Sequence, residues 1–346
     1  MGIKRKGLWT IVALLLAVLT IWAVVSQSGS MSMSELKAAF ASANPVWLAL
    51  AVLFMLGIIF WEGEAVLVIM KGIGYPRSHS RGFLYAAGDV YFSAITPSAS
   101  GGQPASAYFM IKDGLPGALA TAVLVLNLIM YTSAVLVLTW GSILFHPQLF
   151  WGFSVFSKIL IIAGTLALGG LTVLFYLLLR KQQILFGLTQ RLVRLLSKVR
   201  FIRHPERILE KLEKSEKEYK DCVTVMAGRR AMMVKAFLCN FLQRLSQFLV
   251  TVTVYLALGG KLSMVKDVFI TQCMVTLGSN CVPIPGGMGI ADYLMLDGFG
   301  QLLGKEQAFT LEMIGRGFSF YICILVSAVT VVFGYIGIRR RAGKKD

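Results

Sequence analysis

Two stretches of this chain carry the same broken hydrophobic pattern: TPSASGGQPASAYFMI at 96–111 and PIPGGMGIADYLML at 283–296. In both, a proline precedes a Gly-Gly pair, and a tyrosine follows the pair after five residues. Proline and glycine interrupt helices, and a bilayer tolerates irregular backbone only where protein or a water-filled cavity surrounds it. Two such breaks in corresponding halves of an apolar chain predict discontinuous helices beside a transporter's substrate site.

The composition around these stretches is that of a polytopic membrane protein. The 346 residues are 56% hydrophobic and 15% charged, and the mean hydropathy is +0.72. A soluble domain cannot hide that much apolar surface. The net charge of +17 comes from loops beside apolar spans, where membrane topology and anionic lipids explain it, so we expect no nucleic-acid partner. The five cysteines lack CxxC or metal-ligand spacing, and we expect no metal or cofactor.

Hydropathy divides the chain into long spans and two interrupted segments. Each span can cross a hydrocarbon core of about 30 Å. The predicted spans are 8–26, 46–70, 116–145, 153–180, 230–258 and 307–338, and the interrupted segments are 82–113 and 264–300. We interpret the interrupted segments as re-entrant hairpins. The first span could be mistaken for a signal peptide, but no clear cleavage site follows it, which favours a retained anchor.

Basic residues set the expected orientation. Lys4, Arg5 and Lys6 place the N-terminus in the cytoplasm, and the stretch 180–230 holds fourteen Lys and Arg against six Asp and Glu. That stretch and the basic C-terminal tail are therefore also expected to be cytoplasmic. The units 46–145 and 230–338 then run in opposite directions, an inverted repeat whose hairpins meet near the midplane.

We therefore expect an all-α fold in which 1–346 form a single transmembrane domain. Within the basic linker 181–229, residues 204–226 show favourably ordered Glu–Lys pairs and an apolar stripe. This pattern indicates an amphipathic helix on the membrane surface, with a partner-binding helix as the alternative.

Ionisable residues inside apolar segments are candidates for a functional role, because placing a charge in an apolar environment costs free energy. The candidate substrate-binding residues are Glu62, Glu64, Asp89, Arg244, Asp292, Glu312 and Arg316. We expect them to line a polar cavity for a charged lipid headgroup, with arginine for phosphate and carboxylates for a cationic group. The alternatives are structural: an intrahelical Glu312–Arg316 pair, and a buried pair between Arg244 and an acid.

The breaks themselves can act as gates. The candidate gating residues are Pro97, Gly101, Gly102, Pro283, Pro285, Gly286, Gly287 and Gly289. The helix that begins after each break would direct its N-terminus at the cavity, which favours an anion such as phosphate. Alternatively, the glycines only permit tight helix crossing.

Signals of catalysis are missing from the sequence. The three histidines lie in or beside expected loops, and neither H-E-x-x-H nor G-x-S-x-G occurs. We therefore predict no catalytic residues, and the sequence argues against an enzyme without excluding one.

The two broken motifs and the late Arg316 resemble the lysylphosphatidylglycerol synthase transmembrane family, the membrane region of the bacterial multiple peptide resistance factors. The resemblance covers nearly the whole chain, and PxPGGxG is its most specific part. It implies flipping of aminoacylated phosphatidylglycerol to the outer leaflet. The added lysine there reduces the negative surface charge, and so the membrane repels cationic antimicrobial peptides. In two-domain relatives a separate cytoplasmic domain performs the aminoacyl transfer.

The chain departs from the family pattern in three places. It ends at Asp346, soon after its last span, so we expect the transferase domain to be absent. Where many relatives have Glu and Arg after the first break, this chain has Gln103, Pro104 and Ala105. Asp292 stands where many relatives have Glu.

The leading hypothesis is a phospholipid flippase of the bacterial inner membrane, with both termini cytoplasmic. Its substrate would be of the phosphatidylglycerol or lysyl-phosphatidylglycerol type, and the function would contribute to antimicrobial peptide resistance. A separate aminoacyl-lipid synthase and a homo-oligomer are open as partners. The alternatives are a membrane-embedded lysyltransferase, or the membrane subunit of one, and a carrier of small solutes or ions.

Overall fold

A computed structural model describes residues 40–96, 100–181, 187, 191, 205–280 and 289–342. Within these ranges the regular elements are helices, which confirms the all-α prediction. In chain order they are α3 (Pro45–Gly72), α4 (His79–Ile95), α5 (Gly102–Lys112), α6 (Gly117–Phe145), α7 (Pro147–Gly152), α8 (Val155–Arg180), α10 (Pro205–Ala227), α11 (Arg230–Ala257), α12 (Val265–Ser279), α13 (Ile290–Leu303), α14 (Lys305–Arg316) and α15 (Cys323–Ala342), with a 3₁₀ turn at Leu262–Met264 and a π-helical turn at Gly317–Ile322.

The predicted spans correspond to long helices of the structure. Within the described residues, four helical stretches are long and apolar enough to cross a membrane: α3, α6, α8 and the continuous stretch Lys305–Ile338. The expected span 230–258 forms α11, whose 28 residues are long enough to span although it carries more polar side chains. The expected span 8–26 lies outside the described residues.

Local sequence explains where α3 begins and ends. The side chain of Asn44 accepts a hydrogen bond of 2.9 Å from the amide of Val46, and Pro45 occupies the first turn. Both features favour a helix start. The chain leaves the helix through Gly74, whose φ of +91° suits glycine.

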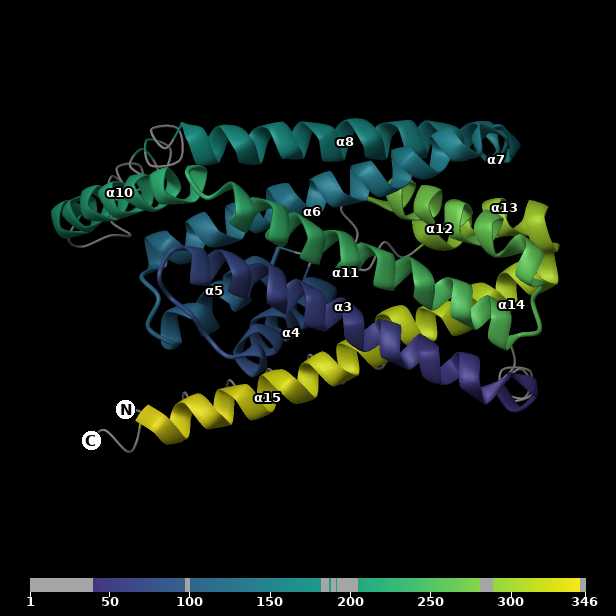
Figure 1. Ribbon diagram of the computed structural model, residues 1–346, viewed down its shortest axis with the longest axis horizontal. Coiled ribbons are helices and arrows are strands. Elements are labelled where there is room, and N and C mark those ends of the chain that lie inside the picture. Colours follow the sequence, from purple (N-terminus) through teal and green to yellow (C-terminus); the bar gives the residue numbers. More distant parts are fainter. Residues whose placement is uncertain are drawn as a thin grey trace.

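Each interrupted segment forms two helices separated by a break. The first consists of α4 and α5, and the second consists of α12 and α13. Figure 1 shows these two hairpins at opposite ends of the long axis, with α10 near the first hairpin and α7 near the second. This placement is the one expected for an inverted repeat.

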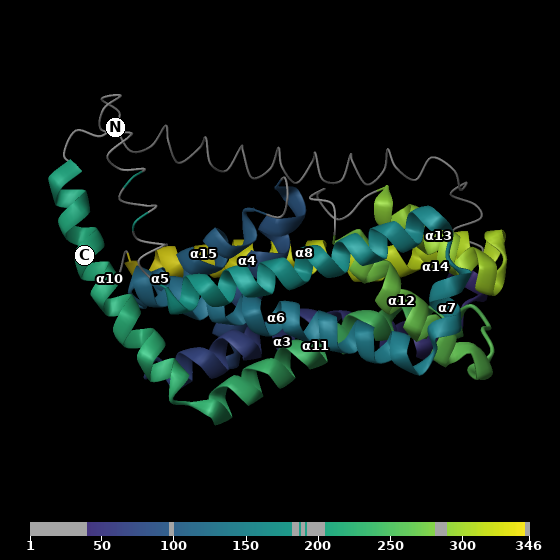
Figure 2. The same cartoon turned by 90° about the horizontal axis from the view of Figure 1, so that it is seen from above.

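The long helices form two layers. Figure 2 shows α3, α6 and α11 in one layer and α4, α8 and α15 in the other. Among the described helices, α3 and α11 pack together most extensively, so the first helices of the two units form the centre of the fold. Close approach depends on glycine at Gly63, where an added Cβ would lie 2.5 Å from the backbone of Gly82 in α4.

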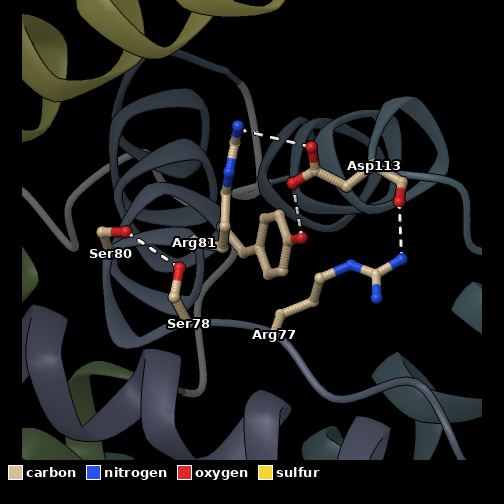
Figure 3. A network of polar contacts seen from close by, with 6 residues as sticks. Arg77, Ser78, Ser80, Arg81 and Asp113 are labelled. Atoms are coloured by element: carbon tan, nitrogen blue, oxygen red, sulfur yellow. Dashed lines mark hydrogen bonds and ion pairs between the residues drawn. The ribbon is translucent and has the colours of Figure 1, made fainter.

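A polar clamp holds the two ends of the first hairpin together (Figure 3). Arg77 donates to the carbonyl oxygen of Asp113 over 2.6 Å, and Arg81 forms an ion pair of 3.3 Å with the Asp113 carboxylate. The hydroxyl of Tyr85 donates to the same carboxylate over 2.6 Å. One aspartate after α5 therefore fixes the start of α4.

Candidate functional site: a polar cavity between the hairpins

A cavity of about 980 Å³ lies between the two hairpins. It is lined by α3, α6 and α11, by α4 and α5 of the first hairpin, by α12 and α13 of the second, and by α8, α14, the π-helical turn and α15. The two interrupted segments thus meet the same space although about 180 residues separate them in the sequence.

One face of α11 supplies much of the polar wall. Gln243, Arg244, Gln247 and Thr251 line the cavity, and Asn240 continues the stripe as a buried residue that donates to Asn127 on α6 over 2.9 Å. These positions recur every three or four residues, which places them on one side of a helix. The charge of Arg244 marks it as a candidate in the sequence. Its neutral neighbours on α11 could have been found from their helical spacing of three or four residues.

Arg244 is held in place by neutral groups. Its Nε donates to Gln243 over 3.0 Å, its Nη1 donates to Gln247, and its guanidinium carbon lies 4.1 Å from the ring centroid of Tyr131 on α6. The side chain is 8% exposed. Among the described residues these contacts, rather than an ion pair with an acid, position the guanidinium, which leaves its charge available to an anionic ligand.

Two carboxyl groups face the cavity beside Arg244. Glu62 on α3 accepts a hydrogen bond of 3.2 Å from Gln243. Asp89 on α4 accepts from Gln103 over 2.6 Å and from Ser93 over 3.1 Å. The structure therefore brings together Arg244, Glu62 and Asp89 from three different helices.

A second charged group lies at the other hairpin. Arg316 at the end of α14 forms an ion pair with Asp292 on α13, so its partner is across the helix interface. The other carboxylate oxygen of Asp292 accepts from the amide of Gly289 over 2.8 Å, which caps α13. Glu312, 5% exposed, lies one turn before Arg316 on α14. Of these, Arg316 lines the cavity directly.

The π-helical turn at Gly317–Ile322 follows Arg316 immediately. Ser319 and Phe320 of this turn also line the cavity. Such turns interrupt the regular ladder of α-helical hydrogen bonds and are frequent at functional sites. The hydropathy of 307–338 predicted one regular span, and the sequence carries no signal of this turn.

Glu64 is placed elsewhere. Its carboxylate pairs with His79, whose side chain is 79% exposed, and it is not among the cavity-lining residues. One helical turn covers about four residues, so Glu62 and Glu64 face different sides of α3.

The structure describes some of the candidate gating residues at the two breaks. Gly102 begins α5, and an added Cβ would lie 1.9 Å from Oδ1 of Asp89. Gly101 donates to the Thr96 hydroxyl over 2.8 Å, and Gly289 has a φ of +81° at the start of α13. Each helix N-terminus is thus already beside a carboxylate, Asp89 or Asp292. The other gating candidates, Pro97, Pro283, Pro285, Gly286 and Gly287, lie outside the described residues.

The wall formed by α8 has a different character. Leu166, Leu171 and Leu174 line the cavity together with small residues of the same helix. Leu166 is also 71% exposed, so this apolar wall continues onto the outer surface of the protein. The cavity therefore has a polar centre and an apolar exit.

Each hairpin also presents an acceptor to this space. Oε1 of Gln103 on α5 and Oε1 of Gln272 on α12 are buried, and within the described part of the chain they have no hydrogen-bond partner. Both glutamines line the cavity. Buried acceptors without partners are costly, so this space suits a ligand with hydroxyl or amine donors.

Comparison with known proteins is consistent with this architecture. A family model described as the lysylphosphatidylglycerol synthase TM region matches residues 10–327. The UPF0104 membrane protein PH1989 of Pyrococcus horikoshii is 26% identical over 144 residues, which are 41% of this chain and 42% of that protein. The matched part is thus less than half of the relative. No solved structure matches the chain.

Proposed function

From the premise that this chain belongs to the family of the lysylphosphatidylglycerol synthase transmembrane region, we propose that it moves phospholipids of the phosphatidylglycerol or lysyl-phosphatidylglycerol type across a membrane. The observation that carries this proposal is the cavity of about 980 Å³, whose polar centre opens along an apolar wall on α8. An amphipathic ligand needs both environments at once. A small hydrophilic solute would gain nothing from contact with the apolar wall.

The headgroup would lie between the hairpins. Arg244 and Arg316 approach the cavity from different helices and are the two cationic side chains among its lining residues. Guanidinium groups bind phosphate oxygens through charge-assisted hydrogen bonds. Gln103 and Gln272 would accept from headgroup hydroxyl or amine groups, and the acyl chains would follow α8 into the surrounding lipid.

Asp292 holds Arg316 in the absence of a ligand. A lipid phosphate would therefore compete with Asp292 for this guanidinium. Asp292 also caps α13. Separation of Asp292 from Arg316 would therefore loosen the start of α13 in the second hairpin. Binding and movement of a hairpin are coupled in this way.

We place the end that carries α10 in the cytoplasm of a bacterial cell. Lys71, Arg77, Arg81, Lys112 and Arg180 are close to helix termini of that end. The positive-inside rule assigns such an end to the cytoplasmic side. The end of α15 would then be cytoplasmic. Lys4, Arg5 and Lys6 predict the same side for the N-terminus, and the lipid would be carried across the inner membrane.

The decisive experiment uses proteoliposomes that contain the full chain alone. Fluorescent phosphatidylglycerol and fluorescent lysyl-phosphatidylglycerol are compared for access to an external quencher. Protein-dependent access is expected, and a folded protein that moves neither lipid would contradict the proposal. Solute flux without lipid movement would instead support a carrier, and newly formed lysyl lipid would support a transferase.

Arg316→Ala tests the site within the same assay. We expect slower lipid access with an unchanged elution profile, because the variant removes a phosphate ligand from the cavity wall. Glu306→Gln, an exposed change at the start of the same helix, is the matched control. Equal rates in the two variants would remove Arg316 from the binding site.

A further inference from the structure

Glu62 on α3 and Asp89 on α4 line the cavity beside Arg244, and these two helices pack against each other. Two negative charges enclosed with one guanidinium in a space of low dielectric constant repel each other. One proton on the pair removes that repulsion. The arrangement therefore suits a carboxyl pair that holds one proton.

Neutral donors complete this pair. Ser93 and Gln103 donate to the two oxygens of Asp89, over 3.1 Å and 2.6 Å, and Gln243 donates to Glu62 over 3.2 Å. Asp89 thus accepts from two donors, as a charged carboxylate does, while Glu62 accepts from one and is the better place for the proton. The pair bears one negative charge in this arrangement.

The other ionisable groups that act on the pair come from three neighbouring elements. They are Arg244 on α11, Tyr131 on α6 and Cys323 at the start of α15. Of these, only Arg244 is a cation at neutral pH. One guanidinium and one shared proton for two carboxyl groups make this end of the cavity electrically neutral.

A lipid phosphate bound at Arg244 would disturb that balance. Its negative charge would add to the charge of the carboxyl pair in a confined space of low dielectric constant, where like charges repel strongly. A second proton on the pair restores neutrality. Anion binding and proton binding then favour each other, and this coupling is reciprocal.

We propose that Glu62 and Asp89 form a proton-carrying site, and that lipid phosphate and one proton occupy the cavity together. The proposal rests on the lipid-translocating function above and adds the ion that drives it. The proton comes from water on the side where the lipid loads, binds a carboxylate oxygen of the pair, and returns to water on the other side when the phosphate leaves Arg244. No other bond is made or broken.

The position of Asp89 links this proton to the first hairpin. Gly102, the first residue of α5, packs against the Asp89 carboxylate so closely that a Cβ would overlap it. The N-terminus of a helix stabilises a negative charge within its first turn. Protonation of Asp89 weakens this attraction, so loading the site also loosens the break between α4 and α5.

The transport test uses vesicles of phosphatidylethanolamine and phosphatidylglycerol that contain the full chain and fluorescent phosphatidylglycerol. An acidic pH on the loading side is expected to raise the rate several-fold in the natural protein. Asp89→Asn should remove this pH response, because Asp89 is the member of the pair that gains the transported proton and asparagine cannot titrate. Glu64→Gln, at a carboxylate that faces His79 outside the cavity, should retain it.

Lipid movement with the same pH response in Asp89→Asn overturns the proton site and leaves the translocase function intact. A second measurement does not depend on transport. Infrared difference spectra of the purified protein in lipid should show the carbonyl band of a protonated carboxyl group at neutral pH. The band should lose intensity in Glu62→Gln and keep its intensity in Glu64→Gln, because the buried Glu312 is a second source of such a band. Absence of the band from the natural protein, or an unchanged intensity in Glu62→Gln, overturns the proposal even if no lipid moves in any sample.

Discussion

The guanidinium carbon of Arg244 lies 4.1 Å from the centroid of the Tyr131 ring. This contact joins α11 to α6 at the polar centre of the molecule, and both residues line the cavity. A guanidinium stacks on an aromatic face and still exposes its edge donors. Tyr131 therefore orients Arg244 without neutralising it.

The first prediction concerns this pair. Arg244→Lys keeps the charge but loses the stacking and the two hydrogen bonds to glutamine. We expect lipid movement to fall by about 5- to 30-fold, which corresponds to about 1–2 kcal/mol for a desolvated cation–π contact. Tyr131→Phe retains an aromatic face and should stay near the natural rate, whereas Tyr131→Leu should resemble Arg244→Lys. Equal rates for the Phe and Leu variants would exclude a role for the ring.

The second prediction concerns Asp292 and Arg316. Each single substitution, Asp292→Asn or Arg316→Gln, should lower thermal stability in detergent because it breaks the ion pair between α13 and α14. A double-mutant cycle should give a coupling energy of about 1–3 kcal/mol. The same cycle with Glu306→Gln in place of Asp292→Asn should give none, since Glu306 is exposed at the far end of α14. Additive effects of Asp292→Asn and Arg316→Gln would show that the ion pair has no energetic role.

The third prediction concerns the start of α5. Gly102→Ala would put a methyl group 1.9 Å from Oδ1 of Asp89 and 2.0 Å from the hydroxyl of Ser93. We expect a stability loss of about 1–3 kcal/mol from overpacking, together with slower lipid movement. Gly169→Ala on α8, where nothing lies within 4 Å of the added Cβ, is the control. A fully active Gly102→Ala protein would contradict the close packing of the hairpin on Asp89.

The fourth prediction concerns the clamp on the first hairpin. Asp113→Ala removes the carboxylate that Arg81 and Tyr85 share (Figure 3). The buried Tyr85 hydroxyl would lose its partner, at a cost of about 1–3 kcal/mol. Limited proteolysis of the protein in detergent should then show faster cleavage between α5 and α6. Ser80→Ala removes an exposed hydroxyl contact nearby and should leave the cleavage rate unchanged.

The fifth prediction concerns Cys222 on α10, outside the membrane-spanning helices. Burial raises the pKa of its thiol to about 11, because the thiolate is poorly solvated there. The neutral thiol is therefore the stable form at neutral pH, and the reactive thiolate gains population only as pH rises toward that pKa. At about pH 8, roughly one thiol in a thousand is ionised.

Alkylation by a maleimide should accordingly be slow at neutral pH and accelerate with increasing pH. Thr224→Cys in a Cys222→Ser background places a thiol at an exposed position of the same helix and should react much faster. Similar alkylation rates for the two thiols would show that α10 does not bury Cys222 against the bundle.

Several features of this protein follow from the sequence alone. Long apolar runs specify α3, α6 and α8, because a bilayer leaves the backbone no alternative to internal hydrogen bonding. The Pro/Gly breaks in 82–113 and 264–300 predict helix pairs, and the described ends of both pairs are present as α4–α5 and α12–α13. The charges at Arg244, Glu62, Asp89 and Arg316 stand out because ionisable groups are rare in such segments.

Tertiary structure decided which of those charges meet. Glu62 and Glu64 are equivalent in the sequence, but only Glu62 faces the cavity, since helix rotation is set by packing between α3 and α11. The spacing of Glu312 and Arg316 permits a pair within one helix, yet Arg316 binds Asp292 from α13. Glu62 and Asp89 likewise line one cavity only because α3 and α4 pack together there. Sequence determines which residues can carry charge through a membrane, and long-range packing determines which partner each charge has.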